Sequence, residues 1–464
     1  MTQEQSQRHL GTGAEHAQVF ASPWLRFRTL EVALQPRWRS WVLLVVVSVG
    51  AGFLGAKALR VAFIAMLGES EEKGMLQKAL ALDPANPELH HRLGMVLCDS
   101  LGETDRAEGV KHLRRATELN PYAARFWSDL AWVCELDGDT ACAARGVEQA
   151  VKLSPMTPQL HWVAANTLLR AGRRDEALAE FRRLLELDPA YGPATFHVCL
   201  GSLGDPQLIL QKVLPSGKDP RLKLAYINFL NAMGLNDLAR QVWVKTVEAG
   251  TSFPFPLARP YIGHLIEIGR VEEAQSAWRD LEGLGVIPAA DAGGNLVYNG
   301  DFEHTPLNAG LDWQDHVGHY IALDYSDEAA YTGKRCLRID FTVSRNEEYQ
   351  PVNQLVPVPP NQACLLTAFV RSQDITSDSG PRLQVWVHPQ GPTVMSETTV
   401  GTTPWHQLSL KFCTGPDTKL VQLSVIRVRA RTFPTEITGS FWLDTVVLKA
   451  LGPASESACG ASAR

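Results

Sequence analysis

The chain has 464 residues, of which 45% are hydrophobic and 20% are charged, and its formal net charge is -6. That length exceeds one ordinary domain and predicts two or three. No basic stripe is present to contact phosphates, which argues against nucleic acid as a partner. The sequence also lacks a P-loop, a nucleotide-binding glycine fingerprint, HExxH and G-x-S-x-G, so we expect no enzyme.

The first strongly apolar segment begins after residue 40. Residues 1–39 start with many Gln, Ser, Gly and His, and we interpret them as a disordered, basic cytoplasmic tail. Residues 41–56 carry no charge, and Trp38 and Trp41 suit a membrane interface, so a transmembrane helix is predicted over 40–60. A cleaved signal peptide fits less well, because no small-x-small cleavage site follows. A buried helix of a soluble domain is the other alternative.

Basic residues flank this apolar segment unequally. Those before it are Arg26, Arg28, Arg37 and Arg39, and those after it are Lys57, Arg60 and Lys73. The excess before the segment favours a cytoplasmic N-terminus. We therefore expect a single-pass, membrane-inserted protein of the inner (cytoplasmic) membrane, with its C-terminal body periplasmic or extracellular.

Residues 70–285 repeat with a period near 34 residues. The prolines that close successive units are 37, 34 and 34 residues apart, at Pro84, Pro121, Pro155 and Pro189. A second pattern places a glycine, an alanine five residues later and a large side chain four residues after that, starting at Gly138, Gly172, Gly234 and Gly269. The glycine predicts a left-handed end to the first helix of a hairpin, and the alanine a close approach of the second helix.

These units resemble the tetratricopeptide repeat, whose small-residue position falls on Gly109, Ala143 and Ala177. The pattern breaks across residues 201–220, so we expect five or six helix pairs, one of them degenerate. The resemblance implies an all-α solenoid with a groove for a protein partner. Residues in the register of groove-lining positions are Arg92, Asp129 and Asn166. Plain solvated helix surface is the alternative for these three.

The eight cysteines do not predict a zinc site, because no C-x-x-C and no Cys/His cluster with ligand spacing occurs. Cys134 and Cys142 flank a predicted helix–turn–helix corner. A disulfide there would fit an oxidising compartment, and two small buried thiols are the alternative. Cys98 and Cys199 lie on apolar helix faces and are predicted to be core residues.

Helical periodicity ends at residues 286–294, which we predict to be a linker. Over residues 295–450, short β-rich runs alternate with Gly, Pro and Asn turns, which predicts a two-sheet sandwich or jelly roll. The candidate strands are 336–343, 363–372, 382–388, 406–413, 421–430 and 439–448. Residues 451–464 are predicted to be a disordered tail. The predicted fold class is multi-domain: one transmembrane helix, an all-α tetratricopeptide solenoid, then an all-β jelly-roll sandwich.

The β-rich region resembles the β-sandwich carbohydrate-binding modules found beside glycoside hydrolases. Residues 295–303 (NLVYNGDFE) look like the first strand of that family, 333–339 (GKRCLRI) like its G-x-x-S-L-R-I strand, and 439–446 (GSFWLDTV) like its last. The resemblance implies a structural calcium ion held by Glu303 and Asp444, since calcium prefers oxygen ligands. Capping of strand ends is the alternative for both carboxylates.

Sugar binding would require exposed aromatic faces with hydrogen-bonding neighbours. The candidate carbohydrate-binding residues are Trp313, Tyr320, Tyr349 and Trp386, and each would also suit the core or plain surface. Trp442 lies in the predicted closing strand and is expected to be a core residue.

Two functional hypotheses follow. The first is a membrane-anchored scaffold or adaptor of the cell envelope, whose repeat binds a protein partner and whose sandwich binds a polysaccharide during surface-polysaccharide assembly or export. The second is a scaffold for protein–protein interaction alone, whose sandwich has no affinity for sugar.

Overall fold

The structure, a computed structural model, describes residues 37–455 except 101–102, 218, 291–292, 319, 327–328, 344 and 389–390. Most of the two predicted tails, residues 1–36 and 456–464, therefore lies outside the described residues. The chain forms two compact units, residues 1–122 and residues 123–464.

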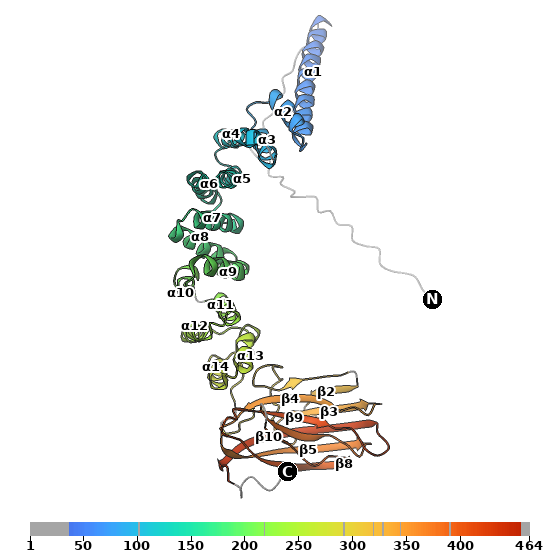
Figure 1. The fold of residues 1–464 in the computed structure, drawn as a ribbon. Coiled ribbons are helices and arrows are strands. Elements are labelled where there is room, and N and C mark those ends of the chain that lie inside the picture. Colours follow the sequence, from blue (N-terminus) through green and yellow to red (C-terminus); the bar gives the residue numbers. More distant parts are fainter. Residues whose placement is uncertain are drawn as a thin grey trace, which may run out of the picture. The chain divides into compact units, whose positions relative to one another are not determined.

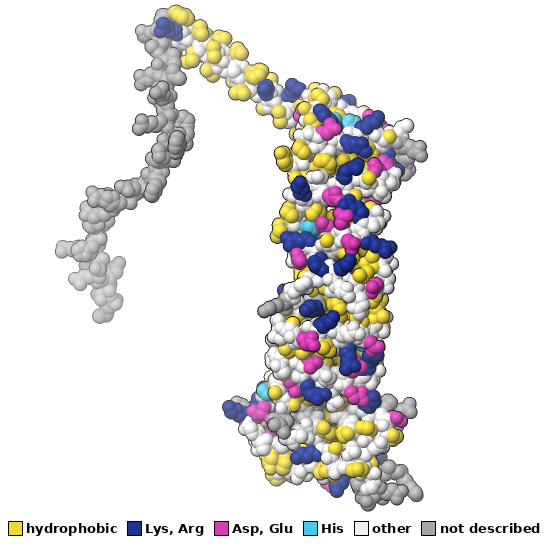
Figure 2. All heavy atoms as spheres, turned by 90° about the vertical axis from the view of Figure 1, so that its left-hand side faces the viewer, with side chains coloured by type: hydrophobic (Ala, Val, Ile, Leu, Met, Phe, Trp, Pro, Cys, Tyr) yellow, Lys and Arg dark blue, Asp and Glu magenta, His cyan; other side chains and the backbone are white. Residues whose placement is uncertain are grey.

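The first unit begins with the apolar helix α1 (Arg37–Gly68), whose side chains are exposed over nearly its whole length (Figure 2). Among the described residues, α1 is the helix long and apolar enough to cross a membrane, a criterion that a signal sequence also meets. At 32 residues it continues past the predicted end at residue 60. The reason is that no Gly or Pro interrupts the sequence between Lys57 and Gly68.

Three shorter helices follow α1 in the described part of the first unit: α2 (Lys73–Leu82), α3 (Pro87–Asp99) and α4 (Glu103–Leu119). Helices α3 and α4 approach closely at Gly94 and Gly109. A Cβ atom added at Gly109 would lie 2.7 Å from the Gly94 carbonyl oxygen and 2.5 Å from Cys98 Sγ. A residue larger than glycine would force the two helices apart, which is the role predicted for the small residue at 109.

The second unit begins with helical hairpins (Figure 1). Their helices are α5 (Ala124–Leu136), α6 (Thr140–Leu153), α7 (Pro158–Arg170), α8 (Arg174–Leu187), α9 (Gly192–Leu203), α11 (Arg221–Ala232), α12 (Asn236–Glu248), α13 (Arg259–Glu267) and α14 (Val271–Gly283). The glycines that end four first helices have φ values of +76°, +78°, +73° and +75°, at Gly138, Gly172, Gly234 and Gly269. The left-handed ends are therefore confirmed.

The hairpin that starts with α9 is irregular. In place of a full second helix it has α10 (Pro206–Leu208) followed by a π-helix (Ile209–Val213). Pro206 and Pro215 bracket this segment and leave room only for a short helix, since proline cannot occupy a helix interior. The predicted break in the repeat is confirmed.

The sandwich consists of two antiparallel five-stranded sheets, ordered β1-β4-β9-β6-β7 and β2-β3-β10-β5-β8. Their strands are β1 (Gln314–Asp315), β2 (Ile321–Ser326), β3 (Cys336–Val343), β4 (Tyr349–Pro357), β5 (Gln362–Ile375), β6 (Arg382–Val387), β7 (Thr393–Met395), β8 (Gly401–Cys413), β9 (Leu420–Arg427) and β10 (Ile437–Pro453). Alternate residues of both sheets fill one core, to which Leu337, Val385 and Leu423 belong.

The expectation of a first strand over residues 295–303 is wrong. This segment forms turns, in which Asn299 and Phe302 have φ values of 51° and 56°. The Asn295 side chain bonds to the Val446 carbonyl and the Leu448 amide, so it takes the place of a neighbouring strand. An Asx side chain that bonds to backbone in this way favours a turn over a ladder.

The last hairpin and the sandwich share a hydrophobic core. Trp278 of α14 packs edge-on against Tyr298, with ring centroids 5.3 Å apart, and Leu311 joins the same cluster. A Cβ atom added at Gly310 would lie 2.4 Å from the Trp278 ring. Ile287, in the segment predicted as a linker, is buried in this core. The sandwich is therefore packed against α13 and α14 and does not hang from a free tether.

Candidate functional site

One outer surface of the sandwich carries two rows of uncharged side chains. On the sheet β1-β4-β9-β6-β7, residues that alternate with the core residues point away from the core. The strand register aligns Gln314, Asn353, Ser424 and Gln384 in one row, in which Ser424 is only 1% exposed. It aligns Leu355, Gln422, Trp386 and Thr393 in the next. We call these eight residues the amide face.

The amide face offers hydrogen-bonding groups beside one indole ring. Neighbouring strands lie about 4.8 Å apart, so the face extends roughly 19 Å from β1 to β7. The Gln422 amide donates to Ser424 Oγ at 3.3 Å, and Asn353 Nδ2 lies 2.8 Å from His316 Nε2. The half-buried Trp386 ring rests against the His388 ring, with centroids 3.9 Å apart. Because amides both donate and accept, such a surface suits a neutral ligand rich in hydroxyl groups.

On the outer surface of the other sheet, the aromatic rings contact arginine side chains or one another. The guanidinium groups of Arg338 and Arg371 lie 5.4 and 4.8 Å from the centroid of the Trp442 ring. Trp442 is consequently only 6% exposed, although its register places it on the outer side of β10. Tyr331 stacks on Phe369 with a centroid distance of 3.8 Å. Tyr331 nevertheless remains 42% exposed.

The four aromatic residues predicted to bind sugar do not come together. Trp313 is 0% exposed and donates its indole N–H to the Asn299 carbonyl, so it belongs to the core and cannot stack on a ligand. The Tyr349 ring packs against the sandwich core, and burial raises the pKa of its phenol. Tyr320 is 40% exposed but precedes β2 in the other sheet. Of the four, Trp386 lies on the amide face.

The two predicted calcium ligands both accept hydrogen bonds from one loop. Glu303 Oε1 accepts from the Lys334 and Arg335 amides at 2.6 and 3.0 Å. Asp444 Oδ2 accepts from the amides of residues 331 and 332 at 2.8 and 2.9 Å, and its Oδ1 from the amide of residue 445. Burial raises the pKa of the Asp444 carboxyl.

This arrangement does not fit a calcium cage. The carboxylate oxygens are aimed at N–H donors, whereas calcium requires six to eight oxygen ligands around one point. Within the described ranges, no group of three or more His, Cys, Asp or Glu side chains could hold a metal ion. We therefore assign both carboxylates to holding the loop that contains Gly333.

The predicted disulfide partners are adjacent. Cys134 of α5 and Cys142 of α6 are joined by a disulfide, with Cα atoms 5.7 Å apart. The bond closes the corner of a hairpin whose turn already contains the left-handed Gly138. Cys98 and Cys199 are buried, as predicted.

Two of the three predicted groove residues, Arg92 and Asn166, make local contacts. Arg92 donates to the Gly68 carbonyl at 2.8 Å and to Glu88 at 3.2 Å, so it holds the last turn of α1. Asn166 donates to the carbonyl of residue 162, one turn earlier in its own helix, at 2.8 Å. Asp129 is half-buried on α5.

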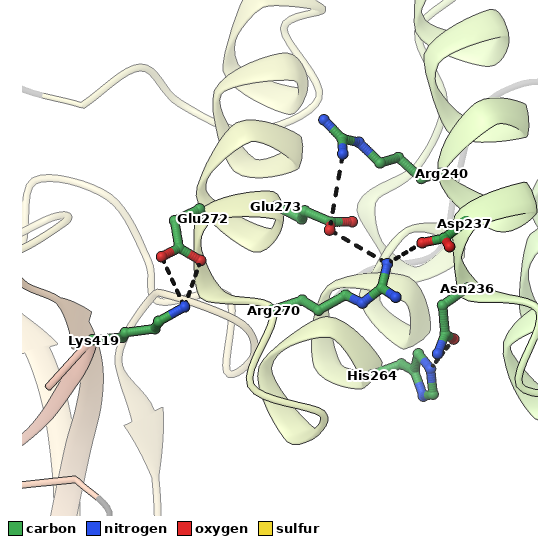
Figure 3. Close-up of polar contacts among 8 residues, drawn as sticks. All are labelled: Asn236, Asp237, Arg240, His264, Arg270, Glu272, Glu273 and Lys419. Carbon is green, nitrogen blue, oxygen red and sulfur yellow. Dashed lines mark hydrogen bonds and ion pairs between the residues drawn. The ribbon is translucent and has the colours of Figure 1, made fainter. Parts of the chain in front are cut away.

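A network of charges fixes the last two hairpins beside the sandwich (Figure 3). Arg270 bridges Asp237 at 2.7 Å and Glu273 at 3.4 Å, which links α12 to α14. His264 of α13 lies 2.8 Å from the amide oxygen of Asn236. Lys419, which precedes β9, pairs with Glu272 of α14 at 2.9 Å. These contacts tie α12, α13 and α14 together and join α14 to the sandwich.

The sequence did not predict the amide face, although it identifies the residues that one strand contributes to it. Leu383, Val385 and Val387 alternate along the predicted strand 382–388, so Gln384 and Trp386 must point to its opposite side. What the alternation could not supply was the strand order. Gln314, Asn353 and Ser424 become neighbours of Gln384 only through the pairing of β1, β4, β9 and β6.

Comparison with known proteins gives only partial likenesses. No family model and no curated protein matches the chain. A family 16 carbohydrate-binding module-2 structure is 19% identical, covers 33% of this chain and 99% of its own, and has a TM-score of 0.26. A crystal structure of MamA is 16% identical, covers 38% of this chain and 85% of its own, and has a TM-score of 0.25. The structure of TmCBM61 in complex with β-1,4-galactotriose is 15% identical, covers 34% of this chain and 98% of its own, and has a TM-score of 0.24.

Proposed function

We propose that the chain is a membrane-anchored scaffold of the cell envelope whose sandwich binds a neutral glycan on the amide face. The observation that carries this proposal is the pair of residue rows across the sheet, with Trp386 among them. The helical hairpins, which we take as tetratricopeptide repeats, would bind a protein partner. A role in surface-polysaccharide assembly or export would join the two activities.

The chemistry of the amide face supports a neutral glycan. None of its eight residues is itself ionisable; the ionisable side chains beside them are Arg382, His316 and His388. Sugar hydroxyls both donate and accept, as do the amides of Gln384, Gln422, Asn353 and Gln314. The apolar face of a sugar ring can pack against an indole ring while the hydroxyls at its edge reach the amides.

Two features of this chain support the compartment that we propose. Helix α1 supplies an apolar segment of sufficient length, and the Cys134–Cys142 bond requires oxidising conditions. We infer a single-pass protein of the cytoplasmic membrane with its C-terminal body outside the cytoplasm. Protease treatment of sealed vesicles tests this: digestion of the body in inside-out vesicles, with protection in right-side-out vesicles, would overturn it.

Glycan binding is tested on the full chain in detergent micelles, using an array that includes β-1,4-galactotriose, the ligand of one similar structure. Trp386→Ala is expected to weaken binding about tenfold or more, as removal of a central aromatic residue does. Tyr320→Ala is the matched control, because Tyr320 is exposed near the other sheet. An array without hits, or equal affinity of the Trp386→Ala chain, would overturn the proposal.

A second candidate is a scaffold that binds proteins alone. The core shared by α14 and the sandwich favours it, because the sandwich then acts as a rigid extension of the repeat. Under this alternative, the array is empty while the full chain still captures its protein partner. Loss of capture on deleting a hairpin, with no change on Trp386→Ala, would support it.

A further inference from the structure

The amide face ends at a cavity whose far wall is a helix of the repeat. This cavity has a volume of about 540 Å³. Gln314 and Leu355, one from each row of the amide face, lie on one side of it. The other side is α13, through Arg259, Gly263, His264 and Glu267. The two surfaces are therefore continuous, and α13 stands at the β1 end of both rows.

The helical wall is fixed in position. Gly310, which lines the cavity, is in contact distance of both Ile262 and Trp278, so the loop before β1 lies directly against the last hairpin. The ion pair of Lys419 with Glu272 adds a second tie between the sandwich and α14. A ligand that reaches the cavity meets a preformed surface, which lowers the entropic cost of binding.

The wall has a different chemistry from the amide face. Arg259 and Glu267 are exposed ionisable side chains, and Arg259 forms no ion pair among the residues that the structure describes. Gly263 lies between them on the helix, and nothing lies within 4 Å of a Cβ atom added there. The glycine therefore leaves room for a ligand group between two charged side chains. Charged donors and acceptors form stronger hydrogen bonds to hydroxyls than amides do.

We propose that α13 forms a terminal subsite for the glycan, so that the protein recognises the end of a polysaccharide chain. This inference rests on the proposed glycan-binding function of the amide face. Sugar units lying across the strands from β7 toward β1 run into α13, where the last unit enters the cavity. Arg259 and Glu267 then bond its hydroxyl groups. An internal segment of a long chain does not fit, because α13 blocks its continuation.

The experiment measures the affinity of the full chain in detergent micelles for an oligosaccharide series, from disaccharide to hexasaccharide, of the glycan that the array identifies. Gly263→Leu places a side chain in the cavity between Arg259 and Glu267, and leucine favours the helix more than glycine does. It is expected to weaken binding of the longer oligosaccharides about tenfold while the disaccharide is unaffected. The double substitution Arg259→Ala and Glu267→Ala is expected to give a similar but smaller loss. Arg279→Ala, on the exposed side of α14, is the matched control.

The outcomes separate the two proposals. Unchanged affinity in both α13 variants, with binding still lost on Trp386→Ala, overturns the terminal subsite and leaves the glycan-binding function in place. Binding of a cyclised or internally embedded chain as tightly as a free end also overturns the subsite. If the unaltered chain binds no glycan at all, both proposals fail. Hydrogen exchange of α13 in each variant verifies that the helix remains folded.

Discussion

The helical hairpins and the sandwich bury their polar side chains in different ways. In the hairpins a histidine ties its helix to the preceding turn. His90 Nε2 lies 3.1 Å from the Pro84 carbonyl oxygen, and His161 Nε2 lies 3.0 Å from that of Pro155, each six residues along the chain. The other ring nitrogen faces the second helix of the same hairpin, at His112 or Glu180.

In the sandwich a buried polar group joins segments that are far apart in sequence. Arg427 is 0% exposed. Its guanidinium donates to the carbonyl oxygens of Ser379 at 3.3 Å, Glu347 at 2.7 Å and Thr435 at 2.6 Å. One side chain therefore holds three separate loops.

This difference predicts how far the loss of stability should extend when a polar contact is removed. Removing a polar contact in a hairpin affects a few turns, since each hairpin contacts only its neighbours. Removing one in the sandwich releases loops on which the whole two-sheet core depends. The predictions below test that contrast by hydrogen exchange on the full chain, which reports each region separately.

The largest effect is expected for Arg427→Met. Methionine fills much of the same space but leaves three carbonyl oxygens without their donor. We expect the free energy of unfolding of the sandwich to fall by about 3–5 kcal/mol, as when one partner of a buried charged contact is removed. Hydrogen exchange should accelerate across the strands of both sheets. Arg345→Met is the control, because the Arg345 side chain is 68% exposed. An effect confined to residues next to 427 would break the contrast.

A smaller and local effect is expected for Gly109→Val. The added side chain would collide with the Gly94 carbonyl and Cys98, and overpacking of this kind costs about 1–3 kcal/mol. Faster exchange should appear in α3 and α4 only. Gly74→Ala, in α2, is the control: nothing lies within 4 Å of its added Cβ, so a slight stabilisation is expected. Faster exchange in the sandwich of the Gly109→Val chain would contradict the local character of the hairpins.

Acidification should destabilise the hairpin of α3 and α4 and stabilise the loop of the sandwich that contains Asp312. Burial, with the nearby His90, lowers the pKa of His112. The hairpin then binds fewer protons than the unfolded chain, so its stability is present above about pH 6.5 and is lost as the pH falls. Burial raises the pKa of Asp312 to about 6, so its contribution is present at low pH and is lost as the pH rises through 6.

Exchange measured at about pH 7.5 and about pH 5, corrected for intrinsic rates, tests these directions. At the lower pH the α3–α4 hairpin should exchange faster and the loop of residues 304–313 more slowly. His112→Gln should abolish the first change, and Asp312→Asn the second. The same direction of change in both regions would contradict the assignment.

The sequence predicts the hairpins better than the sandwich for a physical reason. A helical repeat is built from local spacings, so Gly138 and Gly172 reveal both their conformation and their place in the fold. Strands pair across long separations, and alternation says only which residues share a side. It predicted β3 with its observed bounds, Cys336–Val343, but could not tell that Trp313 is buried.

The candidate site could be predicted only in part for the same reason. Trp386 is recognisable as an outward residue of a strand, yet its neighbours Gln422 and Leu355 depend on strand order. The position of α13 beside this face is still harder to predict from the sequence, because it depends on how Trp278 packs against Gly310. In the chain, Trp386 lies 31 positions from Leu355 and 36 positions from Gln422. No spacing rule connects them.

The smallest effect is expected for removal of divalent metal. Glu303 and Asp444 direct their oxygens to the amides of residues 331–335, so a chelator should leave the exchange and melting temperature of the sandwich unchanged. Glu303→Gln should nonetheless accelerate exchange of Lys334 and Arg335, because an amide oxygen accepts these bonds less strongly than a carboxylate does. The pair of measurements distinguishes a loop held by hydrogen bonds from one held by an ion. If added calcium raises the melting temperature and Glu303→Gln abolishes that rise, the carboxylates bind the ion and the sandwich depends on a ligand that the hairpins do not need.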